Sequence, residues 1–393
     1  MKSKENKIKQ LLQEQNIDGA IISSPENFHY IAGFAGHQHT VSRQPGFSFA
    51  VMSCNDNVPT HAATMDFEEE TFRLKNANNL IIKKYDTWVG LRKKEEIENF
   101  TDAPPAAIFE SSFDVLIKTV KELDLYNKKI GLEMDYLPIN YYRQLAESFP
   151  KAEFVNISDL FVYARSVKTA EEIEMFRKLC AVADEGFYKV SQLAAPGVSE
   201  KELAACFRQS VIASNFCVPS SWSMFSTGVN AARLTLPENN IIKEGDVVKF
   251  DAGVNAEFDF YTTDTSRSWI IGKGDPVVTA LKDRLYEAQR KMIAAAKPGL
   301  PICELFQTGY NWVHEKYPSY RRGHLGHSIS LGPATAEAPY INQSEKRPLE
   351  AGMVLAMEVP CYMPNYAGFN IEDMVLITEN GAEILTPKTP HYI

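Results

Sequence analysis

Short apolar runs alternate with amphipathic segments along the first 160 residues of the chain. Runs such as GAIISS, FSFAVMS, LIIKKY and KIGLEM have the length of buried strands and are bounded by polar residues. Between them, apolar residues recur at helical spacing up to Leu12, over Val115–Leu123 and before Pro150. This alternation predicts an α/β layer in which helices pack on a mixed sheet.

A different pattern begins near residue 160, after the segment FVNISDLFVYARSVK. It predicts helices over Glu171–Ala194 and Ser199–Ser214, then later helices over Pro276–Ala296 and from about Pro301. The predicted strands are Asp246–Ala252, Tyr261–Ile271, Met353–Pro360 and Phe369–Ile377. Helices and strands grouped in this way indicate an α+β domain. We therefore place one domain at residues 1–160 and a second at 161–393.

Composition narrows the class of protein. A net charge of -9 over 393 residues argues against nucleic acid or an anionic membrane as the main partner. The six cysteines show no CxxC pairing and indicate free thiols in a reducing compartment. The N-terminus lacks an apolar signal core, and no run approaches the length of a membrane span. We therefore expect a soluble, cytoplasmic protein.

Five potential metal ligands stand out in the second half of the chain. They lie in VVKFDAG, YTTDTSR, GHLGHSIS, MVLAMEV and GFNIEDMVLIT, and they are Asp251, Asp264, His327, Glu358 and Glu372. A buried carboxylate without a partner is costly, so an apolar strand that carries one suggests a compensating cation. Four carboxylates and one imidazole suit two neighbouring divalent ions, and the nitrogen donor favours Mn, Co, Zn or Fe over Ca. Any one of these residues taken alone could instead be a salt-bridged or strand-end side chain.

The order and local sequence of these segments resemble the pita-bread metallohydrolases, the family of prolidase, aminopeptidase P, methionine aminopeptidase and creatinase. The stretch Ala164–Asp184 resembles the helix that opens the catalytic domain in the prolidase and creatinase branch. The motifs KEGDVVKFDAG and IEDMVLITENGAEILT match closely, and NFHYIAGF and IGLEMDYLP extend the resemblance into the N-terminal half. The resemblance implies a pita-bread catalytic domain, with metals on the concave face of a curved antiparallel sheet. It also implies an α/β N-terminal domain of the creatinase/prolidase type.

Spacing agrees with this ligand set. The resemblance implies two aspartates on neighbouring strands of a hairpin, eleven residues apart in the family, whereas Asp264 follows Asp251 by 13. The odd separation is kept, so both side chains can face the same side of the sheet. Asp259 is the competing candidate, but it lacks the Thr-Ser-Arg tail that follows Asp264. Asp373 should point to the opposite face from Glu372.

The chain also departs from the family. Histidines that the resemblance would place near Thr235, at Gly323 and at Ala334 are missing, and Asn370 stands where an arginine is expected. His324 could be a relocated proton shuttle, an alternative ligand or a solvated loop histidine. These losses weaken the expectation of proline specificity. Creatinase, by contrast, loses the metal ligands themselves, so a metal-independent reaction is not expected here.

The resemblance implies a dinuclear metallohydrolase like Xaa-Pro dipeptidase, with manganese among the expected metals. A metal-activated water would attack an amide C–N bond, with Glu358 as base and His324 as a further candidate catalytic residue. The substrate would be a small peptide or another small molecule. The alternatives are a family member that cleaves a non-peptide substrate by C–N hydrolysis or elimination, and a catalytically inactive pita-bread binding protein.

The segment NFHYIAGFAGHQHTVSRQPGFSFAV resembles the part of creatinase and prolidase that leans over the partner's active site in a homodimer. His37, His39 and Arg43 are therefore candidate substrate-binding residues in trans, and Arg43 suits a substrate carboxylate. A polar surface loop is the alternative reading. Trp222 is a further candidate for the pocket wall, although an aromatic residue there could equally belong to the core.

Overall fold

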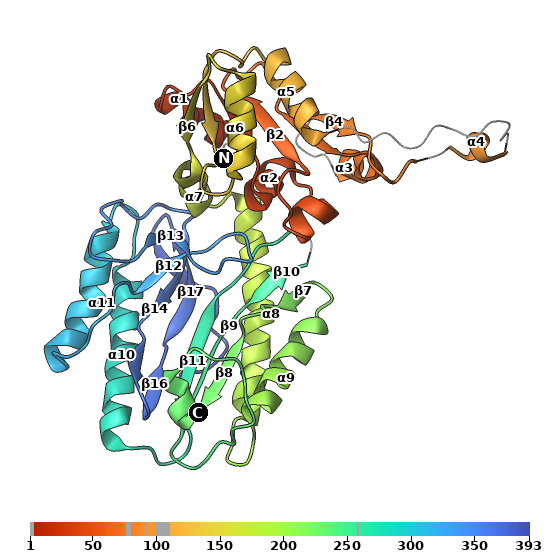
Figure 1. The fold of residues 1–393 in the computed structure, drawn as a ribbon. Coiled ribbons are helices and arrows are strands. Elements are labelled where there is room, and N and C mark those ends of the chain that lie inside the picture. The colour runs from red at the N-terminus through yellow and green to blue at the C-terminus, as the bar shows by residue number, and fades with distance from the viewer. Residues whose placement is uncertain (1–3, 76–79, 92, 99–110, 258) are drawn as a thin grey trace. The chain divides into compact units, whose positions relative to one another are not determined.

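The computed structural model describes residues 4–75, 80–91, 93–98, 111–257 and 259–393. The chain divides into two compact units, Met1–Ala164 and Arg165–Ile393 (Figure 1). Six cysteines carry free thiols. Among the described residues, no helix combines the length and the apolar character needed to cross a membrane.

The first unit is built on a six-stranded sheet with the order β4-β3-β2-β1-β5-β6. The central strand β1 pairs antiparallel with β2 and parallel with β5, so the sheet is mixed. This confirms the predicted α/β layer. The strands are β1 Gly19–Ile22, β2 Phe49–Ser53, β3 His61–Met65, β4 Ile81–Tyr85, β5 Lys129–Leu132 and β6 Glu153–Asn156.

Helices complete the first unit, together with a π-helix at His37–Val41 and a 3-10 turn at Asp66–Glu68. The α-helices are α1 Lys4–Glu14, α2 Pro25–Ala32, α3 Glu69–Lys75, α4 Lys94–Glu98, α5 Ser112–Glu122, α6 Ile139–Ser148 and α7 Ser158–Ser166. The apolar pattern did not predict α2, because nearly all of its residues are buried and no polar face marks the helical period. Ser24 caps its start and Gly33, at φ 63°, ends it.

The second unit contains antiparallel sheets flanked by α-helices. A three-stranded sheet has the order β11-β9-β8, and a five-stranded sheet has the order β13-β12-β14-β17-β18. The strands of these sheets are β8 Met224–Thr227, β9 Val247–Ala252, β11 Thr265–Ile270, β12 Gly326–Ser328, β13 Glu337–Tyr340, β14 Val354–Glu358, β17 Glu372–Thr378 and β18 Gly381–Ile384. Two short pairs accompany them, formed by β7 Cys217–Pro219 with β10 Val254–Ala256 and by β15 Cys361–Met363 with β16 Ala367–Phe369.

The four helices of the second unit cover the sheets from outside (Figure 1). They are α8 Ala170–Leu193, α9 Glu200–Ile212, α10 Pro276–Ala295 and α11 Ile302–Lys316. Capping boxes at Thr169 and Ser199 satisfy the first backbone N–H groups of α8 and α9. Helix α9 packs against β8, and α10 packs against β14.

Strand β9 has one face that packs in an aromatic core and another that carries Asp251, one of the predicted metal ligands. Phe250 stacks on Phe187 with ring centroids 4.1 Å apart and also contacts Trp269. Because side chains alternate along a strand, Lys249 and Asp251 project from the opposite face of β9. One face of this short strand is therefore fixed by aromatic packing, which sets the direction of the charged side chains on the other.

Two predicted strands lose regular pairing over part of their length. The strand expected from Tyr261 begins only at Thr265, because Tyr261 is drawn into a bridge with Leu331 and donates a hydrogen bond to Glu172. The strand expected from Phe369 is divided into β16 and β17, with Asn370 between them. Both interruptions lie next to predicted metal ligands.

Candidate metal centre

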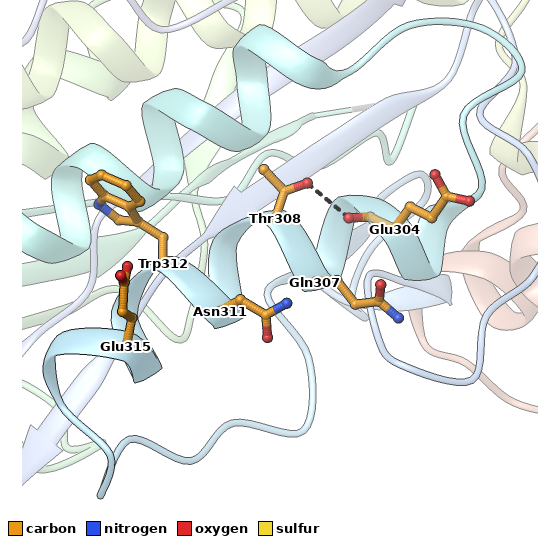
Figure 2. A pocket seen from close by; sticks show the side chains of 6 residues that line it. All are labelled: Glu304, Gln307, Thr308, Asn311, Trp312 and Glu315. Carbon is orange, nitrogen blue, oxygen red and sulfur yellow. Dashed lines mark hydrogen bonds between the residues drawn. The ribbon is translucent and has the colours of Figure 1, made fainter.

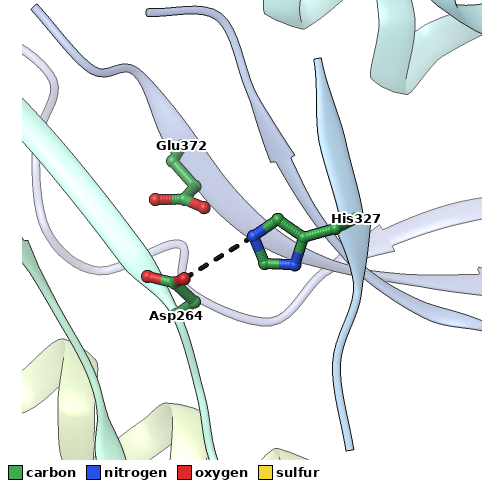
Figure 3. Close-up of side chains that lie close together, drawn as sticks. All are labelled: Asp264, His327 and Glu372. Carbon is green, nitrogen blue, oxygen red and sulfur yellow. Dashed lines mark ion pairs between the residues drawn. The ribbon is translucent and has the colours of Figure 1, made fainter. Parts of the chain in front are cut away.

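Three of the predicted ligands meet in the second unit. Asp264 precedes β11, His327 lies in β12 and Glu372 begins β17, and potential ligand atoms of all three lie within 4.8 Å of one another (Figure 3). All three side chains are buried, and His327 Nε2 is 3.6 Å from Asp264 Oδ2. Three residues that are well separated in sequence thus form one group with an imidazole and two carboxylates.

Asp251 adjoins this group through β9. Together with burial, its negative charge contributes to raising the pKa of Asp264. Asn370 links it to a second ligand, because its amide Nδ2 donates to Asp251 Oδ2 at 3.3 Å and to Glu372 Oε2 at 3.4 Å. The residue that stands in place of the family's expected arginine therefore holds two carboxylates of the cluster.

Glu358 lies directly opposite Glu372 in the β14–β17 ladder. Its Oε1 is held by Arg322 Nη2 at 3.1 Å and lies 3.3 Å from His324 Nδ1. The tight group of ligand atoms does not include Glu358, although its charge raises the pKa of Asp251, Asp264 and Glu372. Glu358 thus stands beside the cluster with a second pair of polar neighbours.

The electrostatics of the cluster indicate a shortage of positive charge. Burial, followed by the neighbouring carboxylates, raises the pKa of Asp264 and Glu372 well above their ordinary values. Burial also raises the pKa of Asp251, although Lys249 opposes this. Burial lowers the pKa of His327 to about 4, so its imidazole is neutral at pH 7 and able to donate a lone pair. Among the described residues, Asp264 Oδ1 is buried without a hydrogen-bond partner.

This donor set fits divalent cations. Buried carboxylates that repel one another are stabilised by a cation, and oxygen ligands with one imidazole are the usual donors for Mn, Zn and Fe. The partnerless oxygen of Asp264 supplies an acceptor that the protein itself leaves unused.

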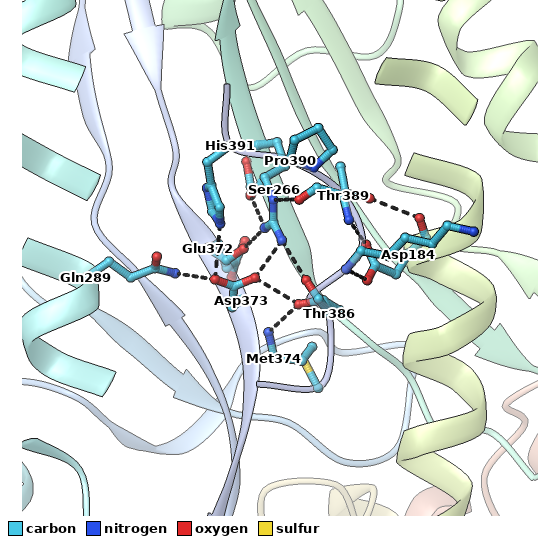
Figure 4. A network of polar contacts seen from close by, with 12 residues as sticks. Asp184, Ser266, Gln289, Glu372, Asp373, Met374, Thr386, Thr389, Pro390 and His391 are labelled. Carbon is cyan, nitrogen blue, oxygen red and sulfur yellow. Dashed lines mark hydrogen bonds and ion pairs between the residues drawn. The ribbon is translucent and has the colours of Figure 1, made fainter. Parts of the chain in front are cut away.

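Asp373, the neighbour of Glu372, is buried but fully paired (Figure 4). Its oxygens accept hydrogen bonds from Arg267 at 2.6 Å, from Thr386 at 3.0 Å and from Gln289 at 3.3 Å. Burial alone would raise its pKa, but Arg267, His391 and Arg290 hold the pKa well below its usual range. Asp373 is therefore a structural anion and, as expected, not part of the ligand group.

Lys249 is a functional candidate that the sequence analysis did not single out. It is 0% exposed on the same face of β9 as Asp251, and its Nζ donates to the Arg233 carbonyl at 3.2 Å and lies over the Tyr362 ring. Burial lowers its pKa, while Asp251 and Glu358 oppose that shift. The signal was present in VVKFDAG, where a lysine interrupts an apolar strand two residues before a ligand.

The other predicted site residues are described within their own units. Trp222 is partly exposed in the loop between β7 and β8. In the first unit, the His39 ring is buried edge-to-face against Phe28, and burial lowers its pKa to about 4. Arg43 Nη1 forms an ion pair with Glu26 at 2.6 Å, and the His37 backbone N–H donates to Glu68.

A hollow along α11 offers no comparable chemistry (Figure 2). It is lined by Glu304, Gln307, Thr308, Asn311, Trp312 and Glu315. Trp312 lies between the cationic groups of Arg284 and Lys291, at 3.7 and 3.9 Å from the ring centroid. We interpret this hollow as a polar surface feature.

Comparison with known proteins agrees with the family that the sequence motifs indicated. Residues 174–379 match the model of metallopeptidase family M24, and residues 5–167 match the Creatinase/Prolidase N-terminal domain. A Xaa-Pro dipeptidase from Pyrococcus furiosus is 27% identical over 391 residues, which cover 98% of both chains.

Solved structures share the fold over the whole chain. A Xaa-Pro dipeptidase from Bacillus anthracis superposes with a TM-score of 0.81 at 24% identity and covers 99% of both chains. The prolidase from Pyrococcus furiosus gives a TM-score of 0.75 at 25% identity and covers 96% of this chain and 98% of its own. These matches confirm the pita-bread catalytic domain and the creatinase-type N-terminal domain. Because the M24 model spans more than half of the chain, the protein belongs to metallopeptidase family M24, in the prolidase-like branch of the pita-bread metallohydrolases.

Proposed function

We propose that this protein is a dinuclear metal-dependent hydrolase that cleaves an amide C–N bond, with Glu358 as the general base. The observation that carries the proposal is the buried group of Asp264, His327 and Glu372, whose ligand atoms lie within 4.8 Å of one another. The Asn370 amide, which donates hydrogen bonds to both Asp251 and Glu372, supports a larger donor set.

Two divalent ions would be held by Asp251, Asp264, His327, Glu358 and Glu372, with Mn, Co, Zn or Fe as the expected metals. When bound, such ions polarise a carbonyl group and make water acidic enough to supply hydroxide near neutral pH. Asn370 orients two of the carboxylates through its amide group. Hydrogen bonds of this kind fix the direction of ligands and tune their basicity.

Glu358 is the residue best placed to move protons in this site. Its carboxylate would accept a proton from the attacking water, while Arg322 fixes its orientation through the 3.1 Å hydrogen bond. His324 lies 3.3 Å from the same oxygen, within reach to take that proton and deliver it to the leaving nitrogen. This geometry supports the proton-shuttle role for His324 over the solvated-loop alternative.

Xaa-Pro peptides are the first substrate class to test, because curated relatives are named Xaa-Pro dipeptidase. We nevertheless expect slow cleavage of simple Xaa-Pro dipeptides. Ala334 is exposed and supplies no imidazole, and the Asn370 amide is occupied with two carboxylates instead of a substrate. These replacements favour a small non-peptide amide as the second candidate. An inactive binding protein would have no need for a buried group of mutually repelling carboxylates.

Metal analysis and a substrate panel test the proposal together. Protein purified without chelator should contain about two divalent ions per chain by plasma mass spectrometry, and the Asp264→Asn variant should lose most of them. Xaa-Pro dipeptides, other dipeptides and small amides should then be compared at equal enzyme concentration, with and without added Mn²⁺. If metal-free protein gains no turnover on any of these substrates when Mn, Co, Zn or Fe is added, the result would contradict the proposed hydrolase function.

We further propose a homodimer that works in the cytoplasm. The resemblance of the segment around His37, His39 and Arg43 to a partner-covering loop supports the dimer. Six free thiols support a reducing compartment.

A further inference from the structure

A cavity of about 450 Å³ opens between the start of α10, the loop that follows α11 and the β15–β16 hairpin. Apolar side chains line much of it, among them Val278, Leu281 and Met363. Its volume lies within the range of about 300 to 1,000 Å³ that is common for small-molecule sites. The whole lining belongs to the second unit.

The charged residues that line this cavity are all basic. Arg321 and Arg322 line it, and its described lining includes neither Asp nor Glu. Two further donors are left unused among the described residues, because Tyr320 Oη and Arg322 Nε are buried without hydrogen-bond partners. Tyr320 is only 5% exposed, so water does not readily satisfy its hydroxyl group. Tyr320 and Arg322 both line the cavity, and an acceptor that carries negative charge would suit their unpaired donors.

The cavity shares a wall with the metal centre. Arg322 lines the cavity and donates through Nη2 to Glu358 Oε1 at 3.1 Å. Tyr362 also lines it, and the ring of Tyr362 carries Lys249 Nζ 4.7 Å from its centroid. A ligand in the cavity would therefore contact two side chains that also touch residues of the metal centre.

We propose that this cavity binds a small organic carboxylate with an apolar body. The body would pack against Val278, Leu281 and Met363, and the carboxylate would accept hydrogen bonds from Arg322 and Tyr320. A cation would be repelled by the two arginines, and a neutral apolar molecule would leave the buried donors unpaired. This site shares Arg322 with the proposed reaction, but its binding does not require the protein to be a hydrolase.

Binding should be coupled to the metal centre through Arg322. A carboxylate that takes the guanidinium of Arg322 releases Glu358 for a metal ion. Metal and carboxylate should therefore strengthen each other's binding by the same factor, because such coupling is reciprocal. Couplings of this kind are typically about five- to 150-fold.

Isothermal titration calorimetry with 4-phenylbutyrate tests the site in chelator-treated full-length protein. The matched alcohol, 4-phenylbutan-1-ol, keeps the apolar body and removes the charge, so it should bind at least about tenfold more weakly. Arg322→Gln should weaken the acid to a similar degree, and Met363→Trp should block it by filling the cavity. Arg208→Gln removes an exposed arginine on α9 and should leave binding unchanged.

Two results would overturn the proposal. Equal binding of the acid and the alcohol, or unchanged binding in Met363→Trp, would exclude this cavity as a carboxylate site. Addition of Mn²⁺ to the wild-type protein should tighten binding about fivefold or more, and an unchanged affinity would refute the link through Glu358.

Discussion

Two buried aspartates in the second unit have opposite electrostatic roles. Asp373 accepts hydrogen bonds from Arg267, Gln289 and Thr386, and its pKa lies well below its usual range. Asp264 has a buried oxygen without a partner among the described residues, and burial together with Asp251 and Glu358 raises its pKa. One carboxylate therefore stabilises the fold, whereas the other is stable only with a proton or a cation.

Neutralising these two aspartates should change stability in opposite directions. In chelated protein at pH 8, Asp264→Asn should increase the free energy of unfolding by roughly 1–3 kcal/mol, because the folded wild type must either bury the charge of Asp264 or hold a proton on it, and the amide avoids both costs. The same change at Asp373 should destabilise by about 3–5 kcal/mol, because it leaves the buried Arg267 without its carboxylate partner. Denaturant unfolding in EDTA measures the free energy of unfolding of both variants. A lower value for Asp264→Asn than for the wild type would refute the shortage of positive charge in the ligand group.

The pH dependence of the Asp264 effect has a defined sign. Because the folded-state pKa of Asp264 is raised, the wild-type carboxyl gains a proton, and the protein gains stability, as pH falls through that pKa. The advantage of Asp264→Asn should therefore shrink on acidification from pH 8. Saturating Mn²⁺ should reverse the order of the two proteins at pH 8, since metal stabilises only the form that binds it.

Glu358→Gln should lower kcat by at least about 100-fold while the fold remains intact, because it removes the proposed base. Steady-state kinetics on the best substrate of the panel measures this effect. Glu379→Gln, in the exposed turn between β17 and β18, is the matched control and should keep normal turnover. Near-normal turnover in Glu358→Gln would exclude Glu358 as the base.

At the level of single residues, the sequence predicted the ligand group but not its neighbours. Asp264 and Glu372 could be recognised because acidic residues in apolar runs require a partner, and His327 because its segment resembles the family's ligand segment. Arg322 could not be recognised, since nothing in the pattern of a loop arginine indicates that its guanidinium reaches Glu358. Asn370 was recognised as a departure, but its two hydrogen bonds to carboxylates depend on how three strands approach one another.

At the level of elements, the position of Asp264 depends on a close backbone approach. Gly253 follows β9, and a Cβ atom placed there would lie 1.7 Å from the carbonyl oxygen of Thr263. Thr263 precedes Asp264 directly, so this contact sets the distance between the segments that carry Asp251 and Asp264. A glycine is required because any side chain would push the two segments apart.

Gly253→Ala should therefore weaken both stability and metal binding. The forced shift should cost about 1–3 kcal/mol of stability, and it should reduce Mn²⁺ affinity because Asp264 moves with Thr263. Gly323→Ala is the control, since a Cβ there meets no atom within 4 Å. Thermal unfolding and metal titration of the two variants decide the matter. Equal behaviour of both would show that the approach at Gly253 does not position Asp264.

Some helices and strands were predicted from the sequence and others were missed, and the difference has a physical reason. Amphipathic helices such as α5 and α10 were found because one face is polar and the period is visible. Helix α2 and the π-helix at His37–Val41 were missed, because the former is buried on nearly all sides and the latter is too short to show a period. The late start of β11, at Thr265 instead of Tyr261, was also missed, since the bridge between Tyr261 and Leu331 joins distant segments.

At the level of the whole molecule, family membership is established by matches over both halves of the chain. The arrangement of subunits is a separate question, and Arg43 in the first unit is the residue on which our prediction of a dimer rests. Its guanidinium pairs with Glu26 at 2.6 Å and its side chain remains 40% exposed. An exposed ion pair of this kind contributes little to folding, about 0–1 kcal/mol. The folded state would therefore lose little stability if Arg43 left Glu26 to bind a ligand.

The last prediction is that Arg43 completes the site of a partner subunit in a homodimer. Arg43→Ala should raise KM at least about tenfold with little change in Tm, because a charge-assisted contact to a substrate carboxylate is lost. Arg73→Ala is the matched control, since Arg73 makes a similar exposed pair with Glu69 at 2.8 Å. Mixed dimers of Arg43→Ala and Glu358→Gln subunits should regain part of the activity, because one of the two sites would combine an intact loop with an intact base. Sedimentation must confirm the mixed dimer. Absence of recovery in a confirmed mixed dimer would place Arg43 outside the partner's site.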